Sequence, residues 1–204
     1  MTSLRHNSPE IVRSAANLAL DAARQSILDL GWSRTTLTEV ARRAGVSRMT
    51  IYRKWPDMGA LLGDLMTREW ADLVQVDTTG ATALDRLVRS AVSTVQAVRA
   101  NPLFARIVEV DPELLLPYLL QRAGRSQRLV IDALVTQIRL GQAAGEVRAG
   151  EPELLARSIV LASHGFVLSV ATMTGAGVSR SKLDDELATL LEGYLAVPSG
   201  SSRP

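Results

Sequence analysis

Cysteine is absent from the 204-residue sequence, and histidine occurs only twice, at His6 and His164. The lack of cysteine excludes disulfide scaffolds, thiol nucleophiles and zinc or iron–sulfur sites built on cysteine. The start, MTSLRHNSPE, lacks the apolar segment of a signal peptide. The most apolar run, residues 154–173, is interrupted by Arg157 and His164, which favours a buried or interface helix over a membrane span. We therefore expect a cytoplasmic protein without a metal or another cofactor.

Charge is distributed unevenly along the chain, although the formal net charge is only +2. Up to Asp57 there are nine Lys or Arg residues and five Asp or Glu residues, a net charge of +4, whereas the remainder has a net charge of −2. A basic segment beside a mildly acidic body indicates a polyanionic partner for the first quarter of the chain only. The alternative is a basic face that is simply solvated.

Helical periodicity dominates the sequence, and no alternating strand pattern is present, so we predict an all-α fold. A helix should begin at Ser8-Pro9-Glu10, which combines a capping hydroxyl, an early proline and an acid. Hydrophobic residues make up 47% of the chain, enough for a sizeable core. The predicted helices cover approximately residues 8–30, 36–44, 48–55, 57–76, 82–100, 102–109, 111–120, 125–144, 152–174 and 181–196.

Two short helices joined by a glycine turn are predicted within EVARRAGVSRMTIYRKW, residues 39–55. Thr36 and Glu39 have the spacing of a capping box at the start of the first helix. Gly45 suits the left-handed position of a tight turn, and Ser47 can cap the second helix. This is the arrangement of a helix-turn-helix motif. In such a motif the first helix crosses the DNA backbone and the second enters the major groove.

The second helix has two different faces on a helical wheel. Ile51 and Trp55 share one face and should anchor the helix, while Met49, Thr50 and Arg53 lie on the opposite face. The flanks carry Arg48, Tyr52 and Lys54. The major groove of DNA admits one α-helix, and a polar and cationic outer face suits contact with its base edges and phosphates. The alternative is a basic helical hairpin that only packs against the protein.

The stretch LTEVARRAGVSRMTIYRKWPDMGALL resembles the DNA-binding signature of the TetR family of transcriptional regulators. The resemblance extends back through ALDAARQSILDLGWSRTTL and forward to about Trp70, a third of the chain. The sequence departs from the family at Met49, where the family often has glycine or a small residue, and at Met58, where it commonly has lysine. The resemblance implies DNA contacts by the following residues: Thr36, Arg43, Ser47, Arg48, Met49, Thr50, Tyr52, Arg53 and Lys54.

The resemblance also implies the organisation of the whole chain. A flexible arm at residues 1–12 would precede a helix-turn-helix DNA-binding domain at 13–73, with its motif at about 37–55. A helical domain at 74–197 would dimerise and bind a ligand, and a flexible tail would follow at 198–204. The expected protein is a homodimer that binds a palindromic operator in double-stranded DNA, represses transcription and is released by a small-molecule effector.

The last two long helices would form the dimer interface, and the central bundle would hold the effector. The predicted interface residues are Leu155, Ile159, Phe166, Leu187, Leu191 and Tyr194. The predicted pocket residues are Trp70, Phe104, Tyr118 and Phe166. A core or interface role for His164 is favoured over contact with a ligand.

Two other classes of function were weighed against this one. An all-helical enzyme would need an acid–base pair, a nucleophile or a metal cluster, and the sequence presents none of these patterns. A helical ligand- or protein-binding module without specific DNA recognition would not require the five basic residues at positions 42, 43, 48, 53 and 54. DNA binding that weakens steeply with salt would distinguish the regulator from this module.

Overall fold

The computed structural model describes residues 14–74, 77–120 and 124–198, and these residues form helices and loops. Within these ranges the only β-type pairing is a bridge between Gly175 and Val178, and no strand forms, so the predicted all-α fold is confirmed. The chain divides into two compact units, Met1–Leu62 and Gly63–Pro204. Helix α4, Met58–Leu73, contributes residues to both.

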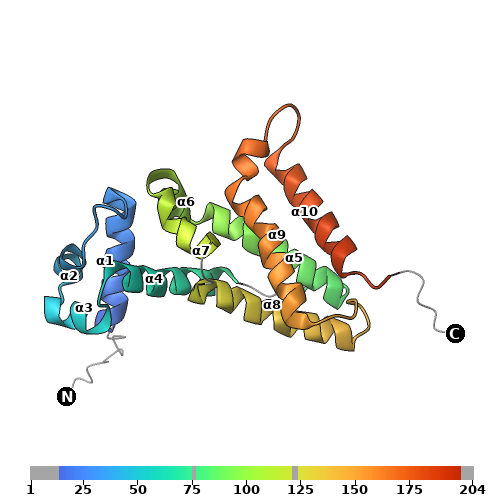
Figure 1. Cartoon of the computed structure of the whole chain (residues 1–204), viewed down its shortest axis with the longest axis horizontal. Helices are drawn as coiled ribbons and strands as arrows, with labels where there is room; N and C mark the ends of the chain where they lie inside the picture. Colours follow the sequence, from blue (N-terminus) through green and yellow to red (C-terminus); the bar gives the residue numbers. More distant parts are fainter. Residues whose placement is uncertain (1–13, 75–76, 121–123, 199–204) are drawn as a thin grey trace, which may run out of the picture. The chain divides into compact units, whose positions relative to one another are not determined.

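The first unit contains α1 (Ala15–Leu30), α2 (Leu37–Ala44), α3 (Arg48–Lys54) and the start of α4. Helices α1, α2 and α3 pack against one another, as the blue and cyan ribbons of Figure 1 show. Helix α1 begins after Ser14, whose hydroxyl accepts a hydrogen bond from the backbone N–H of Asn17. The helix start predicted at Ser8 and the arm at residues 1–12 lie outside the described residues. The core of this unit comprises Ala19, Leu20, Ala23, Ile27, Leu37, Val40, Ala41, Ile51, Trp55, Leu61 and Leu62.

The second unit is a helical bundle around α5 (Ala83–Ala100), which contacts α6, α8, α9 and α10. The other helices are α6 (Pro102–Val110), α7 (Leu116–Leu120), α8 (Arg125–Ala143), α9 (Pro152–Leu168) and α10 (Arg180–Leu195). Short 3-10 helices η1 (Pro112–Leu115) and η2 (Val170–Met173) precede α7 and follow α9. None of the helices in the described ranges combines the length and apolar character that a membrane span requires.

Two of the predicted helices are interrupted. The segment predicted as one helix at 111–120 forms η1 and then α7, with prolines at positions 112 and 117 that each remove a backbone donor. The segment predicted at 152–174 ends as an α-helix at Leu168, because the chain leaves the helical path at Ser169 (φ −109°, ψ −3°) before η2 begins.

A buried ion pair joins α5 to α10. Arg99 donates from Nη2 to both carboxylate oxygens of Asp184 at 2.7 Å, and its Nη1 donates to the carbonyl oxygen of Phe166 at 3.2 Å. Gln96 also donates to Asp184 at 2.9 Å. The two charged side chains are only 8% and 9% exposed. Burial raises the pKa of Asp184, but the hydrogen bonds from Arg99 and Gln96 outweigh it and hold that pKa below its usual value.

Four of the six residues predicted for the dimer interface lie in the core of the second unit. Leu155, Ile159, Leu187 and Leu191 lie in the interior of the second unit, each at most 3% exposed, and pack with α5 and α8. Phe166 and Tyr194 are partly buried against the same core. The four leucine and isoleucine side chains are therefore core residues, whereas Phe166 and Tyr194 keep part of their surface exposed. A wheel of α9 or α10 carries apolar residues on two faces, and the sequence alone did not say which one faces inward.

Candidate nucleic-acid interface

The turn between α2 and α3 is fixed by local hydrogen bonds. Gly45 ends α2 in the left-handed region (φ 67°, ψ 25°), a conformation that favours glycine. The N–H of Val46 donates to the carbonyl oxygen of Ala41 at 3.1 Å, which closes a Schellman-type end. The Ser47 hydroxyl then accepts from the N–H of Thr50 at 3.1 Å and caps α3. These bonds set the angle at which α3 leaves the turn.

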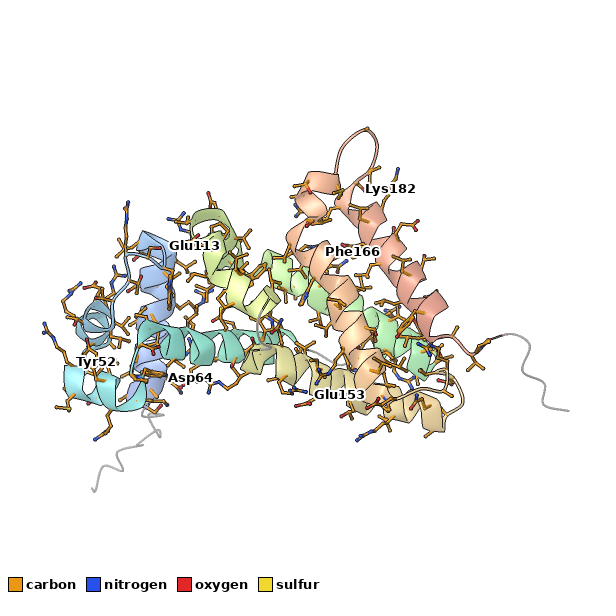
Figure 2. All side chains as sticks on the ribbon, in the orientation of Figure 1. Tyr52, Asp64, Glu113, Glu153, Phe166 and Lys182 are labelled. Carbon is orange, nitrogen blue, oxygen red and sulfur yellow. The ribbon has the colours of Figure 1, made fainter. Side chains whose placement is uncertain are left out.

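Helix α3 is held to the first unit by one face and exposes the other. Ile51 and Trp55 are 1% and 2% exposed. On the outer side Met49 is 75% exposed, Tyr52 is 48% exposed, and Arg53 is also exposed. Figure 2 labels Tyr52 at this helix. The anchoring and outer faces predicted from the wheel therefore occur in the structure. The outer face is open to solvent within the first unit.

Three hydroxyl groups lie at the starts of the two motif helices. Thr36 accepts from the N–H of Glu39 at 3.2 Å and caps α2. The hydroxyls of Ser47 and Thr50 lie 2.8 Å apart and share a hydrogen bond. Thr36 and Ser47 are exposed. Because the Thr36 oxygen accepts from the backbone, its own O–H remains available as a donor to an anion such as a phosphate. Of Ser47 and Thr50, one O–H is used in their shared bond and the other remains available.

Arg43, one of the predicted DNA contacts, is paired with two carboxylates in the structure. Its Nη1 donates to Asp29 at 2.6 Å and its Nε donates to Glu39 at 2.8 Å. Arg42 forms two further hydrogen bonds with the Glu39 carboxylate, at 2.9 and 2.7 Å. Arg43 therefore links α1 to α2, and the two arginines together neutralise the carboxylates of Asp29 and Glu39. The pairing of Arg43 with Asp29 spans 14 residues, so no local pattern in the sequence predicted it.

Glu39→Gln is expected to lower the thermal unfolding temperature at pH 7 and to lose this effect at acidic pH. Hydrogen bonds from Arg42 and Arg43 lower the pKa of Glu39 from 4.5 to about 2. Since the folded state favours the ionised carboxylate, its stabilisation is complete above pH 4.5 and disappears as the pH falls towards 2. Differential scanning calorimetry of both proteins across this range tests it. Asp132→Asn, at an exposed carboxylate on α8, is the control, and a wild-type-to-variant difference that stays constant with pH would contradict the assignment.

The cations left on the outer surface of the motif are Arg48, Arg53 and Lys54, all exposed. The Lys54 ammonium lies 5.1 Å from the centre of the Trp55 ring, which orients it on the flank of α3. Arg34, exposed in the loop before α2, adds a cation that the sequence reasoning missed. Arg34 could have been found from the sequence, because it lies two residues before Thr36, the residue that caps α2. The structure thus brings three predicted cations together on α3 and adds a fourth beside the start of α2.

Two of the predicted pocket residues, Trp70 and Phe104, are in contact in the second unit. Phe104 is 6% exposed and packs edge-on against Trp70, with ring centres 5.7 Å apart. Phe166 lies half-buried on α9, where Figure 2 labels it, and the side chain of Tyr118 lies outside the described part of the structure. A shallow depression of about 470 Å³ occurs elsewhere in the second unit. It is lined by Gln142, Gly145, Val147, Ala149, Gly150 and Val197.

Two further observations concern the protonation of His164 and metal binding. His164 is half-buried, and burial lowers its pKa, which keeps the ring neutral at neutral pH. Within the described ranges, no three His, Asp or Glu side chains gather as a metal site would require.

Comparison with known proteins identifies the family. Residues 19–65 match the model of bacterial regulatory proteins of the tetR family. The HTH-type transcriptional regulator Rv2250c of Mycobacterium tuberculosis is 32% identical over 176 residues, which cover 86% of this chain and 92% of the relative. The chain belongs to the TetR family. It is a DNA-binding transcriptional regulator, and the members of this family are not enzymes.

Two further comparisons agree with the TetR assignment. The HTH-type transcriptional regulator AqdR of Rhodococcus erythropolis is 28% identical over 183 residues, covering 85% of this chain and 82% of AqdR. The crystal structure of the TetR family repressor AlkX from Dietzia sp. strain DQ12-45-1b superposes with a TM-score of 0.66 at 18% identity. The match covers 89% of this chain and 95% of AlkX, so the TetR fold extends through the second unit.

Proposed function

We propose that this TetR family member is a homodimeric repressor that binds a palindromic operator through α3 and is released by a small-molecule effector. In this proposal the first unit is the DNA-binding domain, and the second unit dimerises and binds the effector. The observation that carries the DNA-binding assignment is the outer face of α3, where exposed Arg48, Arg53 and Lys54 surround Met49 and no carboxylate lies in the same helix.

The groups at this face divide into two roles. Met49, Thr50 and Arg53 occupy the side opposite the anchoring face and would meet base edges in the major groove. Groups on the flanks and at the helix starts would bind phosphate: Arg34, Thr36, Ser47, Arg48, Tyr52 and Lys54. Arg43 would contribute through the position of α2, because it bonds to both Asp29 and Glu39 and its side chain is only 25% exposed. Arg42 bonds to Glu39 alone, and its side chain is 71% exposed.

A second copy of the chain is proposed to pack on the outer face of α9 and α10. Leu154, Leu161 and Leu190 are 59%, 72% and 59% exposed, and Val197 follows α10 at 43%. On α9 the positions 154, 158, 161 and 165 share one side of the helix, opposite the buried Leu155, Ala156 and Ile159. Figure 1 shows these two helices side by side, in orange and red. An exposed apolar stripe on neighbouring helices fits a symmetric four-helix interface.

Two glycines support close packing at this interface. Gly165 of α9 and Gly193 of α10 are exposed, and a methyl group added to either would meet no atom within 4 Å in the same chain. Glycine within a helix costs about 1 kcal/mol relative to alanine, so these positions weaken the isolated helices. Close approach of the partner's helices would compensate for this cost.

The effector is proposed to act through α4, because this helix supplies residues to both units. Trp70 on α4 packs against Phe104 on α6, and Asn101 donates to Glu69 at 3.0 Å. A ligand that favours one arrangement of these helices would shift the population of α4 positions and so the spacing of the two α3 helices. The apolar and aromatic residues at this place favour an apolar or weakly polar effector.

Selection of bound sequences from random DNA tests the proposed function and supplies the operator. On that operator, Arg48→Ala is expected to weaken binding roughly tenfold per half-site and about a hundredfold for the dimer, since each subunit loses one charge-assisted contact to phosphate. The magnitude of the slope of log affinity against log salt concentration should fall by about two, one for each subunit. Fluorescence anisotropy over a salt series measures both quantities.

Arg139→Ala is the matched control for this experiment, because Arg139 is an exposed arginine on α8 in the second unit. It should change neither the affinity nor the salt slope. Recovery of no enriched sequence, or an affinity for DNA that does not depend on salt, would contradict the proposal.

A further inference from the structure

Met49 is the most exposed large hydrophobic side chain in the described part of the protein, at 75%. The other large side chain with apolar surface exposed on α3 is Tyr52, 48% exposed, which also carries a hydroxyl. Arg48 and Thr50 are the neighbours of Met49 in the chain, and Arg53 lies one turn further on the same side. An apolar docking surface for another protein would need several such residues in contact. The Met49 thioether is surrounded by cations and hydroxyls. It is therefore suited to contact one small apolar group on a partner that is otherwise polar and anionic.

The position of Met49 is set by the turn and the anchoring face. It is the second residue of α3, directly after the helix start capped by Ser47. Because Ile51 and Trp55 fix the rotation of α3, Met49 points away from the first unit's core. The N-terminal residues of the second helix of a helix-turn-helix motif are those that meet base edges. Arg53 lies about 6 Å further along the axis, within reach of a neighbouring base pair or phosphate.

We propose that Met49 contacts the C5 methyl group of a thymine and so selects thymine at one position in each half of the operator. This inference rests on the proposed function. A thioether is only a weak hydrogen-bond acceptor, so it does not read the donor and acceptor pattern of base edges. The thymine methyl is the apolar group that the major groove presents, and cytosine lacks it. Burial of both groups against each other removes apolar surface from water.

Deoxyuridine scanning of the selected operator tests this contact, because deoxyuridine differs from thymidine only by the loss of the methyl group. At one position per half-site, the substitution should weaken binding by the wild-type protein about fourfold per methyl. Changing both half-sites together should weaken it about sixteenfold, since the two losses multiply. The substitution is made at each thymine in turn, with affinity read by fluorescence anisotropy.

Variants at position 49 assign the effect to Met49. Met49→Ala should bind the thymine and deoxyuridine operators equally well, whereas Met49→Leu, which keeps an apolar side chain, should retain the preference. Leu140→Ala removes a side chain that is 65% exposed on α8 and should leave the wild-type preference unchanged. Circular dichroism checks that each variant keeps its helical content.

Three results would overturn the contact. They are half-sites selected without thymine, a wild-type protein insensitive to every deoxyuridine substitution, and equal sensitivity in wild type and Met49→Ala. In each of these cases specific DNA binding persists, so the proposed function stands while the Met49 assignment fails. Selection that enriches no sequence at all would overturn the proposed function and this contact with it.

Discussion

Arg99→Ala is expected to lower the free energy of unfolding by about 3 to 5 kcal/mol, the usual cost of removing one partner from a buried ion pair. Asp184 would remain in the interior, 6% exposed, without the guanidinium that donates to both of its oxygens. The loss of Arg99 would also raise the pKa of Asp184, because burial would no longer be opposed by that partner. Urea unfolding at a fixed protein concentration measures the change.

Two controls separate the buried charge from a general effect of losing an arginine. Arg128 pairs with Glu153 at 2.8 Å, but these side chains are 47% and 35% exposed. Arg128→Ala should therefore cost no more than about 1 kcal/mol. The double substitution Arg99→Met with Asp184→Leu removes both charges and should recover most of the stability lost in Arg99→Ala. If Arg99→Ala were as stable as Arg128→Ala, the ion pair between Arg99 and Asp184 would not be formed in solution.

Leu161→Glu is expected to dissociate the proposed dimer and to weaken operator binding by about 10² to 10⁴-fold. Leu161 is 72% exposed on α9, so the substitution leaves the subunit core intact. It would bring two carboxylates into an apolar interface across the two-fold axis, which is costly without a compensating partner. The loss of affinity follows because the two α3 helices of a dimer are linked. Once one has bound its half-site, the other is present at a high effective concentration, which separate subunits lack.

Sedimentation equilibrium and binding to full and half operators measure these effects. The variant should be monomeric and should bind a half-site as the wild-type subunit does, with unchanged helical content. Gly165→Leu, which adds a side chain where the glycine has open space, should act in the same direction. Leu140→Glu, at a position 65% exposed on α8, is the matched control and should stay dimeric. A dimeric Leu161→Glu variant would exclude this face as the interface.

The helix-turn-helix motif could be predicted closely because its signals are local. Helices α2 and α3 begin and end within one residue of the prediction, since Thr36, Gly45 and Ser47 act on backbone groups three or four residues away. The anchoring of Ile51 and Trp55 followed from their spacing of four residues. The neutralisation of Arg43 by Asp29 did not follow, because the two residues approach only when α1 packs against α2.

The C-terminal part was predicted less well for the same reason. Its helices were located by periodicity and glycine, but the break at Ser169 has no proline or glycine to signal it. Arg99 and Asp184 are 85 residues apart, and only the packing of α5 on α10 brings them together. The choice between the two apolar faces of α9 and α10 also depends on which face the rest of the bundle covers.

The amino-acid sequence by itself determined the all-α class, the positions of most helices, the glycine turn and the TetR signature. Each of these depends on backbone and side-chain preferences within a few residues. Tertiary structure alone decided which arginines are paired with distant carboxylates, which leucines lie in the core and which stay exposed on the surface. These outcomes depend on contacts between residues far apart in the chain, and such contacts exist only after the helices have packed.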